Sequence, residues 1–210
     1  IDEREEVKVD ECVRLCTDIA KEDWDSFETS WDYKMHPIVR KALSRLHWND
    51  DGDTTLEYVY KFVAQDFEDR FRQLKANEEE LNRIFIDIYG LQDELTPEVD
   101  DRDVTVRKAD LQRDIKSLLS YAVGCMFGRY SLDTEGLAYA GGTWDASKYS
   151  SFLPDADNVI PITDEEYLED DIVTRLCTWL KAVYGEATLE QNLDFIADAL
   201  GNKGNSSRDV

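Results

Sequence analysis

The side chains best suited to bind a transition metal are two cysteines and two histidines in the first quarter of the chain. Cys12 and Cys16 are four residues apart, so a helix would place both thiols on one face. His36 and His47 could then complete a tetrahedral zinc site. This spacing departs from the usual zinc patterns, and small buried cysteines are common in protein cores. The core interpretation is favoured, and no metal site is predicted.

A second candidate is the acidic stretch at residues 49–53 (NDDGD), which superficially resembles a calcium-binding loop. If Gly52 took the sixth position of such a loop, the first and twelfth ligands would be His47 and Tyr58. Neither side chain is a suitable oxygen ligand for calcium. A solvated turn is therefore predicted.

Acidic clusters at residues 164–166 and 169–171 could be interpreted as paired catalytic carboxylates. Acids in the first turn of a helix also satisfy free amides and the helix dipole, and this second interpretation is favoured. The sequence contains no Walker loop, serine elbow, zinc-helix signature or Rossmann glycine fingerprint. We therefore predict no catalytic, cofactor-binding or metal-binding residue in this chain.

Composition and charge exclude several classes of protein. The 210 residues are 42% hydrophobic, enough to bury a core in one or two domains. The net charge of −23 opposes autonomous binding to a polyphosphate. The longest apolar stretch, residues 118–127, is about half the length of a bilayer span, and the first ten residues do not resemble a secretory signal. We expect a cytoplasmic protein with reduced thiols, and a start at Ile1 suggests an internal segment of a longer one.

The elements that position these residues are predicted to be mainly α-helical, with little or no β structure. A short helix is predicted from Glu11 to Lys21, after a cap at Asp10. The aromatic and acidic residues 23–33 are predicted to form an ordered loop. Pro37 is predicted to open the next helix, which ends at the turn of residues 49–52.

The strongest pattern in the sequence predicts one long helix from about Thr54 to Tyr89. This stretch lacks Pro and Gly. Apolar residues recur in it every seven positions, at Tyr60, Phe67, Leu74, Leu81 and Ile88, and Val63, Phe71, Ile84 and Phe85 widen the stripe. A helix of this size would extend roughly 50 Å and would need an antiparallel partner. The apolar segment 109–127 is predicted to be that partner, and Gly90 is predicted to cap the helix.

The last third of the chain combines a long irregular loop, residues 131–162, with two helices. Capping boxes at Thr163 with Glu166 and at Thr188 with Gln191 are predicted to open these helices. Gly185 and Gly201 are expected to end them. We predict a helical domain over residues 1–130 and a loop with a helical hairpin over residues 131–210, packed together as one unit.

Five segments carry a specific likeness to a known family. They are residues 23–33 (DWDSFETSWDY), 82–95 (NRIFIDIYGLQDEL), 120–130 (SYAVGCMFGRY), 158–164 (NVIPITD) and 194–203 (DFIADALGNK). They resemble PglX, the adenine-specific DNA methyltransferase family of BREX phage-exclusion systems, and related restriction-modification methyltransferases share weaker versions. The resemblance covers nearly the whole chain. It implies a parent enzyme that transfers methyl from S-adenosylmethionine to adenine in DNA and so marks host DNA against phage.

The catalytic residues of that family cannot be assigned to this chain. The family's core carries an Asn-Pro-Pro-Tyr type motif that grips a flipped adenine, together with a glycine-containing cofactor loop. The four prolines here are never adjacent. The resemblance therefore implies a segment downstream of the catalytic core that holds no cofactor itself.

Three functions are compatible with these observations. The leading hypothesis is a non-catalytic helical scaffold between the catalytic and target-recognition regions, in contact with the rest of the parent chain and with other phage-defence subunits. A second hypothesis makes the chain part of the DNA target-recognition surface, with Arg129, Lys148 and Tyr149 as contacts. A third is an acidic protein-interaction or DNA-mimic module. The parent enzyme would bind DNA in each of the first two cases, and no membrane partner is expected.

Overall fold

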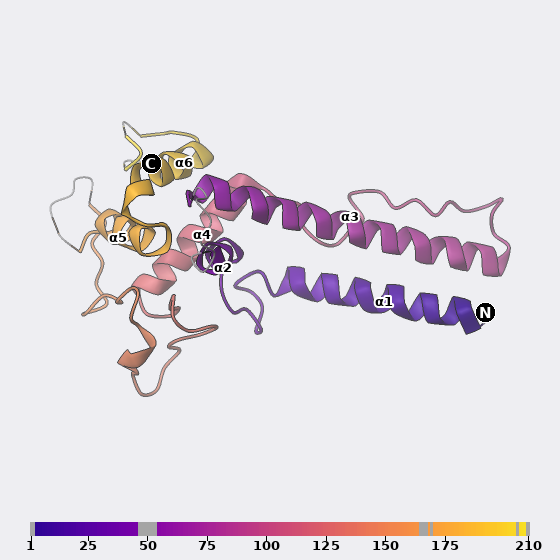
Figure 1. The fold of residues 1–210 in the computed structure, drawn as a ribbon, viewed down its shortest axis with the longest axis horizontal. Helices are drawn as coiled ribbons and strands as arrows, with labels where there is room; N and C mark the ends of the chain where they lie inside the picture. The colour runs from indigo at the N-terminus through magenta and orange to yellow at the C-terminus, as the bar shows by residue number, and fades with distance from the viewer. Residues whose placement is uncertain (1–2, 46–53, 164–167, 169, 205, 209–210) are drawn as a thin grey trace. The chain divides into compact units, whose positions relative to one another are not determined.

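The computed structural model describes residues 3–45, 54–163, 168, 170–204 and 206–208 (Figure 1). Regular structure in these ranges consists of six α-helices and two short 3-10 turns, with no strand among them. The helices are α1 (Glu3–Trp24), α2 (Pro37–Arg45), α3 (Leu56–Tyr89), α4 (Leu111–Met126), α5 (Ile172–Tyr184) and α6 (Leu189–Leu200), and the 3-10 turns are η1 (Ala146–Lys148) and η2 (Glu186–Thr188). The predicted mainly helical class is confirmed. None of the described helices has the length and apolar character needed to cross a bilayer.

The chain separates into two compact units. Unit 1 contains the chain through Trp31 together with Ala64–Ala109, and unit 2 contains Asp32–Val63 and Asp110–Val210. Helix α3 therefore contributes its first two turns to unit 2 and the remainder to unit 1. The predicted division at residue 130 stays a prediction.

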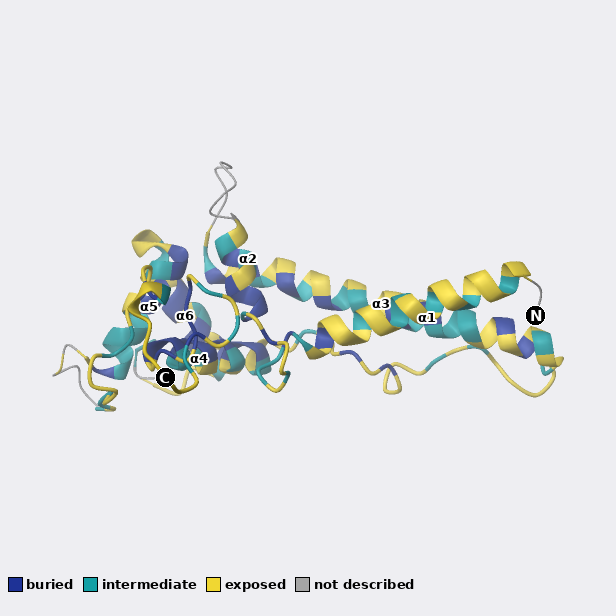
Figure 2. Ribbon diagram, turned by 90° about the horizontal axis from the view of Figure 1, so that it is seen from below, coloured by how far each residue is buried: buried dark blue, intermediate teal, exposed yellow. Residues whose placement is uncertain are grey.

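In unit 1, α1 lies antiparallel to α3: the two helices run side by side in Figure 1 and overlap in the view of Figure 2. Lys8, near the start of α1, forms an ion pair with Glu80, near the end of α3. Glu22, near the end of α1, faces Arg70 at 3.9 Å. The predicted partner of α3, residues 109–127, is therefore wrong. The pairing escaped prediction because α1 has few apolar residues and is held partly by these charges.

Helix α1 is longer than the predicted Glu11–Lys21, since it begins at Glu3 and continues through Trp24. Its added first turn carries Glu3, Glu5 and Glu6. Apolar periodicity is weak there, but acids at a helix N-terminus interact favourably with the helix dipole. The loop predicted for residues 23–33 therefore begins two residues later than predicted, with the turns that follow Trp24.

The predicted bounds and apolar stripe of α3 are largely confirmed. Val63, Phe67, Phe71, Leu74 and Ile84 are buried, whereas Tyr60, Leu81 and Ile88 are half-buried. Phe85 is exposed, so its predicted place in the stripe is wrong. The helix ends before Gly90, whose φ of +68° is the left-handed conformation expected of a glycine C-cap.

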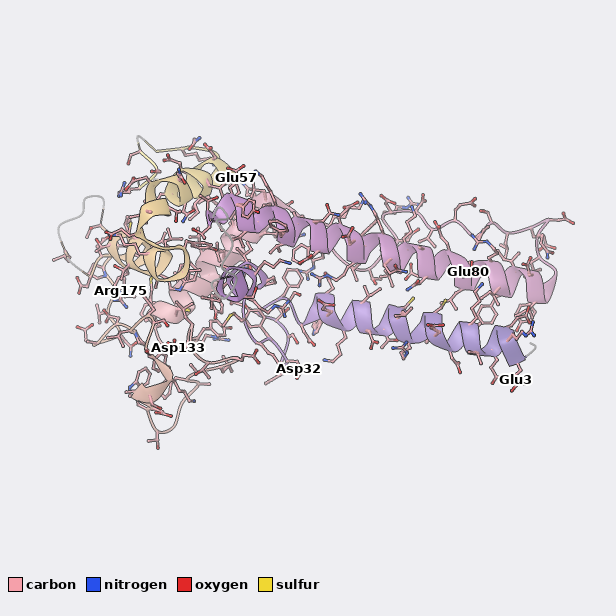
Figure 3. The ribbon with its side chains drawn as sticks, viewed as in Figure 1. Glu3, Asp32, Glu57, Glu80, Asp133 and Arg175 are labelled. Atoms are coloured by element: carbon pink, nitrogen blue, oxygen red, sulfur yellow. The ribbon has the colours of Figure 1, made fainter. Side chains whose placement is uncertain are left out.

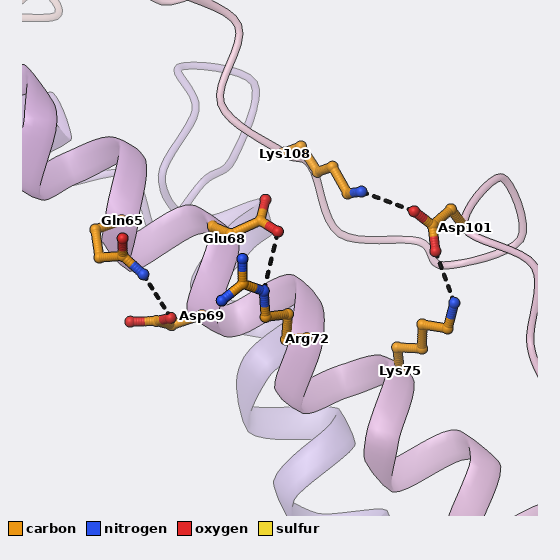
Figure 4. Close-up of polar contacts among 7 residues, drawn as sticks. All are labelled: Gln65, Glu68, Asp69, Arg72, Lys75, Asp101 and Lys108. Carbon is orange, nitrogen blue, oxygen red and sulfur yellow. Dashed lines mark hydrogen bonds and ion pairs between the residues drawn. The ribbon is translucent and has the colours of Figure 1, made fainter.

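The segment that follows α3 returns along the same helix and completes the core of unit 1. Val104 and Val106 pack with Phe71 and Leu74. Partly buried residues of α1 and of the segment itself, Cys16, Ile19 and Val99, cover this cluster. The returning segment thus takes the place of a third helix. One of its acidic residues joins it to α3: Asp101 accepts hydrogen bonds from Lys75 of α3 at 2.7 Å and from Lys108 at 2.8 Å (Figure 4).

The Asp101 carboxylate gives a direct test of this arrangement. Its hydrogen bonds with Lys108 and Lys75 lower its pKa from the ordinary 3.8 to about 2. We expect an NMR titration of the Asp101 carboxyl carbon to show a midpoint near that value. Lys108→Met should move the midpoint upward, and 1 M salt should move it the same way because the three groups are exposed. An unchanged midpoint in Lys108→Met would contradict the bridge.

The core of unit 2 is built from α4, α5 and α6, with α2 packed against α5. Its buried residues are Ile115, Leu118, Tyr121 and Ala122 of α4, Trp179, Leu180 and Val183 of α5, Leu193, Ile196 and Ala197 of α6, and Ile38 and Val39 of α2. Each of these helices therefore buries one apolar face. At the ends of the apolar segment 109–127, however, Leu111 and Phe127 are exposed. The predicted helix after Pro37 is confirmed.

Both predicted capping boxes of unit 2 are wrong. Helix α5 begins at Ile172, and Asp171 caps it by accepting a hydrogen bond from the N–H of Val173 at 2.9 Å. Thr163 instead donates its hydroxyl to the other Asp171 oxygen at 2.7 Å, and Glu166 lies outside the described residues. Thr188 precedes α6 but makes no side-chain capping bond. The Thr188 hydroxyl instead donates to the carbonyl of Tyr184 at 3.2 Å and accepts from Asn192 at 3.1 Å, so both threonines bond to groups other than the helix-opening amides.

Two buried polar side chains fix the first turns of α3 within unit 2. Asn192 of α6 accepts a hydrogen bond from the N–H of Leu56 at 2.7 Å, and its amide nitrogen donates to Thr188 at 3.1 Å. Asp114 of α4 accepts from the Tyr60 hydroxyl at 3.2 Å. The free amide at the start of a helix needs such an acceptor, and here it comes from another helix.

Candidate functional site

The candidate metal ligands are placed as follows. Cys12 and Cys16 are half-buried on α1, and burial, followed by the nearby Glu78 charge, raises the pKa of the Cys16 thiol. His36 is buried in unit 2, and its Nδ1 accepts a hydrogen bond from the N–H of Ile38 at 3.3 Å. His47, the turn at 49–53 and the cluster at 164–166 lie outside the described residues. Within the described ranges, no three His, Cys, Asp or Glu side chains are grouped to hold a metal ion.

A cluster of buried aromatic rings anchors the loop that follows α4. Tyr130 stacks on Tyr121 with ring centroids 4.9 Å apart, and Tyr33 meets both rings edge-on. Trp179 of α5 meets Tyr121 edge-on at 6.5 Å. Gly124 leaves the space that this stack needs, since a Cβ there would lie 2.6 Å from the Tyr130 ring. Two of the segments that resemble the methyltransferase family, residues 23–33 and 120–130, therefore each contribute to one aromatic core, through Tyr33 and through Tyr121 with Tyr130.

Beyond this core, the irregular loop is ordered around a second aromatic stack. Trp144 lies flat on Tyr149, with centroids 4.7 Å apart and planes 6° apart, and Tyr139 meets Trp144 edge-on. Tyr149 is buried, and its hydroxyl donates to the carbonyl of Gly128 at 2.5 Å. Burial, followed by the Asp145 charge, raises the pKa of Tyr149. A buried tyrosine therefore supports a tryptophan that remains largely at the surface.

Carboxylates bind the main chain of the loop in place of regular structure. Asp133 accepts hydrogen bonds from the N–H groups of Ser150 and Ser151 at 2.7 and 2.8 Å (Asp133 is labelled in Figure 3). Burial raises the pKa of Asp133, but the hydrogen bonds from these serines outweigh it and hold the pKa below its ordinary value. Asp145 accepts from the N–H and hydroxyl of Ser147, which lower its pKa. The order of the loop thus depends on ionised aspartates.

The three residues predicted to contact DNA all lie in or beside this loop. The Arg129 side chain is exposed, donates from Nε to the Tyr130 hydroxyl at 3.2 Å and lies over that ring. Lys148 donates from Nζ to the carbonyl of Ala138 at 2.8 Å. Tyr149 is the buried support of Trp144. Contact with DNA stays a prediction for all three.

Sequence reasoning missed an exposed apolar group beside these residues. Phe127, Trp144 and Leu153 are 40%, 48% and 63% exposed. All three are linked to Gly128: Phe127 precedes it in the chain, a Cβ on that glycine would lie 2.9 Å from the Trp144 ring and 3.3 Å from Pro154, and Leu153 precedes Pro154. The N–H of Asp155 also donates to the carbonyl of Met126 at 2.7 Å. We refer to Phe127, Trp144 and Leu153 as the Gly128 patch.

Substitution of Gly128 tests how tightly the patch is assembled. Gly128 has a φ of +73°, and the added Cβ of Gly128→Ala would meet Trp144 at 2.9 Å. We expect Gly128→Ala to lower the free energy of unfolding by about 2–4 kcal/mol, from backbone strain together with overpacking. Gly90→Ala is the matched control, because Gly90 has a φ of +68° and nothing within 4 Å of the added atom. Equal losses in urea denaturation of the two variants would contradict the close packing at Gly128.

Comparison with known proteins identifies two longer relatives. No family model matches the sequence. The chain is 53% identical over 192 residues to the adenine-specific methyltransferase PglX of Lacticaseibacillus casei (strain Zhang), a match that covers 90% of this chain and 16% of that protein. It is 30% identical over 217 residues to the adenine-specific methyltransferase BrxX of Escherichia coli O9:H4 (strain HS), covering 91% of this chain and 17% of the relative. The chain therefore spans about a sixth of the length of the curated relatives it matches.

Proposed function

We propose, from the premise that this chain is homologous to one segment of the PglX-type adenine-specific methyltransferases, that it is a non-catalytic helical scaffold within such an enzyme. The parent enzyme would transfer methyl from S-adenosylmethionine to adenine in cytoplasmic DNA, as part of a phage-defence system. The scaffold would hold the catalytic and target-recognition regions in their working positions. Other defence subunits are further candidate partners.

The observation that carries this proposal is the charge arrangement of unit 1. This unit has 24 acidic and 11 basic residues. Nine of its cations lie within 4 Å of a carboxylate: Lys8, Arg14, Lys21, Arg70, Arg72, Lys75, Arg83, Arg102 and Lys108. DNA binding needs cations that neutralise phosphates, and a surface whose cations already face carboxylates is poorly suited to it. The ion pairs between α1 and α3, Lys8 with Glu80 and Arg70 with Glu22, instead fix the two helices against each other, which supports a structural role.

Two measurements on the isolated chain test the non-catalytic part of the proposal. Calorimetric titration with S-adenosylmethionine should give no heat of binding. A mobility-shift assay with duplex DNA at low salt should give no retarded band, because the net charge of −23 repels the duplex. Binding of S-adenosylmethionine by this chain would contradict a non-catalytic role.

The scaffold role itself requires the full-length parent enzyme. Deletion of the segment that corresponds to these residues should abolish adenine methylation while leaving S-adenosylmethionine binding by the remainder intact. Retained cofactor binding also shows that the remainder is folded. Methylation at the normal rate after the deletion would overturn the scaffold role, and loss of cofactor binding would instead make the segment part of the catalytic core.

DNA contact by the loop of unit 2 is the second candidate function, and the exposed Arg129 favours it. If Arg129 bound a phosphate in the parent enzyme, Arg129→Ala would weaken DNA binding about equally for all sequences. The slope of log affinity against log salt would also become shallower by about one unit. An unchanged slope would argue against this second function.

A further inference from the structure

We infer that the Gly128 patch is the surface through which this segment binds another, apolar part of the same methyltransferase polypeptide. The inference rests on the proposed scaffold function, because it names what the scaffold holds. Its evidence is separate, and comes from the charge pattern, rigidity and exposure of the patch.

The patch is assembled from sequence that lacks charge. Phe127, Trp144 and Leu153 lie at or near the ends of three stretches without charged residues, 117–128, 136–144 and 149–154. In the chain as a whole, 34% of the residues are charged. Contacts around Gly128 bring these stretches together. The buried centres of protein interfaces are depleted in charged residues and enriched in Trp, Tyr, Phe and Met. The Gly128 patch therefore has the composition of an interface centre and not of a solvated surface.

The patch is also held rigid before any partner binds. Trp144 is fixed by the buried Tyr149 beneath it. The carbonyl of Leu153 accepts a hydrogen bond from Arg175 of α5 at 2.6 Å, and the same guanidinium lies over the Phe152 ring (Arg175 is labelled in Figure 3). Ordering side chains and loops on association costs free energy, so a preformed surface binds more tightly than a mobile one. A rigid, half-exposed tryptophan is a typical interface anchor.

The occupant that best fits this surface is another part of the same chain. Two copies of a segment with net charge −23 repel each other, and the same net charge opposes binding of this segment to DNA phosphates. The relatives are about six times as long as the matched segment, so most of the polypeptide lies outside it. Tethering gives such a region a millimolar effective concentration at the patch, which favours binding by a surface of modest area. The partner surface should itself be apolar and uncharged.

Photo-crosslinking in the full-length parent enzyme tests this inference. The photoreactive amino acid p-benzoylphenylalanine in place of Phe127 keeps an aromatic side chain at the patch. Illumination followed by mass spectrometry should identify crosslinks to a region of the same polypeptide outside the matched segment. The control places the same amino acid at Trp31, which is fully exposed in unit 1 and should give at least tenfold fewer such crosslinks.

A second variant confirms that the crosslinks report on the patch. Leu153→Asp puts a charge among the patch residues and should lower the crosslink yield from position 127 at least tenfold. Leu95→Asp, at an exposed leucine of unit 1, should leave the yield unchanged. Crosslinks only to added DNA, only to a second copy, or to nothing would each overturn the inference. A parent enzyme that needs the segment for methylation but gives no intramolecular crosslink would overturn this inference and leave the scaffold function standing.

Discussion

The chain should lose about 2 kcal/mol of unfolding free energy between pH 8 and pH 5 through His36 alone. Burial lowers the pKa of His36 from 6.5 to about 3. The unfolded chain therefore takes up a proton below about pH 6.5 that the folded chain does not accept until about pH 3. The stabilisation is complete above pH 6.5 and declines as the pH falls toward the folded pKa.

The position of His36 gives this effect a structural cause. The residue precedes Pro37 at the start of α2, where its carbonyl accepts from the N–H of Arg40 and its Nδ1 accepts from the N–H of Ile38. Protonation would remove the Nδ1 acceptor and place a positive charge at the positive end of the helix dipole.

The measurement compares urea denaturation of the natural chain and His36→Asn at several pH values. Asparagine is a good cap and does not titrate, so the variant should lack the His36 contribution. Every other group is shared by the two proteins, so its contribution cancels in the difference. Parallel pH profiles for the two proteins would refute the buried, neutral imidazole.

Asn192→Ala should lower the free energy of unfolding by about 2–3 kcal/mol. The substitution removes the acceptor of the Leu56 N–H, which is buried and has no water to replace it. It also breaks the bond to Thr188 and leaves a small cavity in α6. Because the amide at stake lies at the first residue of α3, hydrogen exchange of the first α3 turn should accelerate most.

Asn202→Gly is the control for this experiment, because Asn202 has a φ of +48°, which glycine adopts without strain. Asn202 is exposed and bonds to nearby residues at the end of α6, Asp198 and the carbonyl of Ala197. Its loss should cost about 0.5 kcal/mol or less. Equal losses in the two variants would refute the role of Asn192 as a cap supplied from another helix.

The long helix was predictable because its signal is local. Apolar residues at spacings of three, four and seven, without Pro or Gly, determine the stripe of α3, and Gly90 marks its end. The partner of α3 was not predictable on that basis. Segment 109–127 carries a regular apolar stripe, whereas α1 is held partly by ion pairs between residues about 50 to 70 positions apart, such as Lys8 with Glu80.

The site was predictable only in part. The irregular loop of residues 131–162 was expected, and the three candidate DNA contacts do lie in or beside it. The direction of their side chains was not expected. Tyr149 is buried because its hydroxyl bonds to the Gly128 carbonyl, and Trp144 is the aromatic residue that stays at the surface. The absence of charge in residues 117–128, 136–144 and 149–154 was visible in the sequence and was the signal that could have indicated the Gly128 patch.

The aspartate bonds of the unit 2 loop have a consequence for how acid acts on this protein. Three carboxylates accept hydrogen bonds from main-chain N–H groups, and the pKa of each lies below the ordinary value: Asp133, Asp145 and Asp171. Protonation of a carboxylate would weaken its bonds. The stability they give is complete above about pH 4 and is lost as the pH falls through their folded pKa values. Strong acid should therefore loosen this loop in steps, as a reductant opens a loop held by disulfides. Substitution of any one of these aspartates by Asn, which keeps an acceptor oxygen, should make that hydrogen bond insensitive to acid.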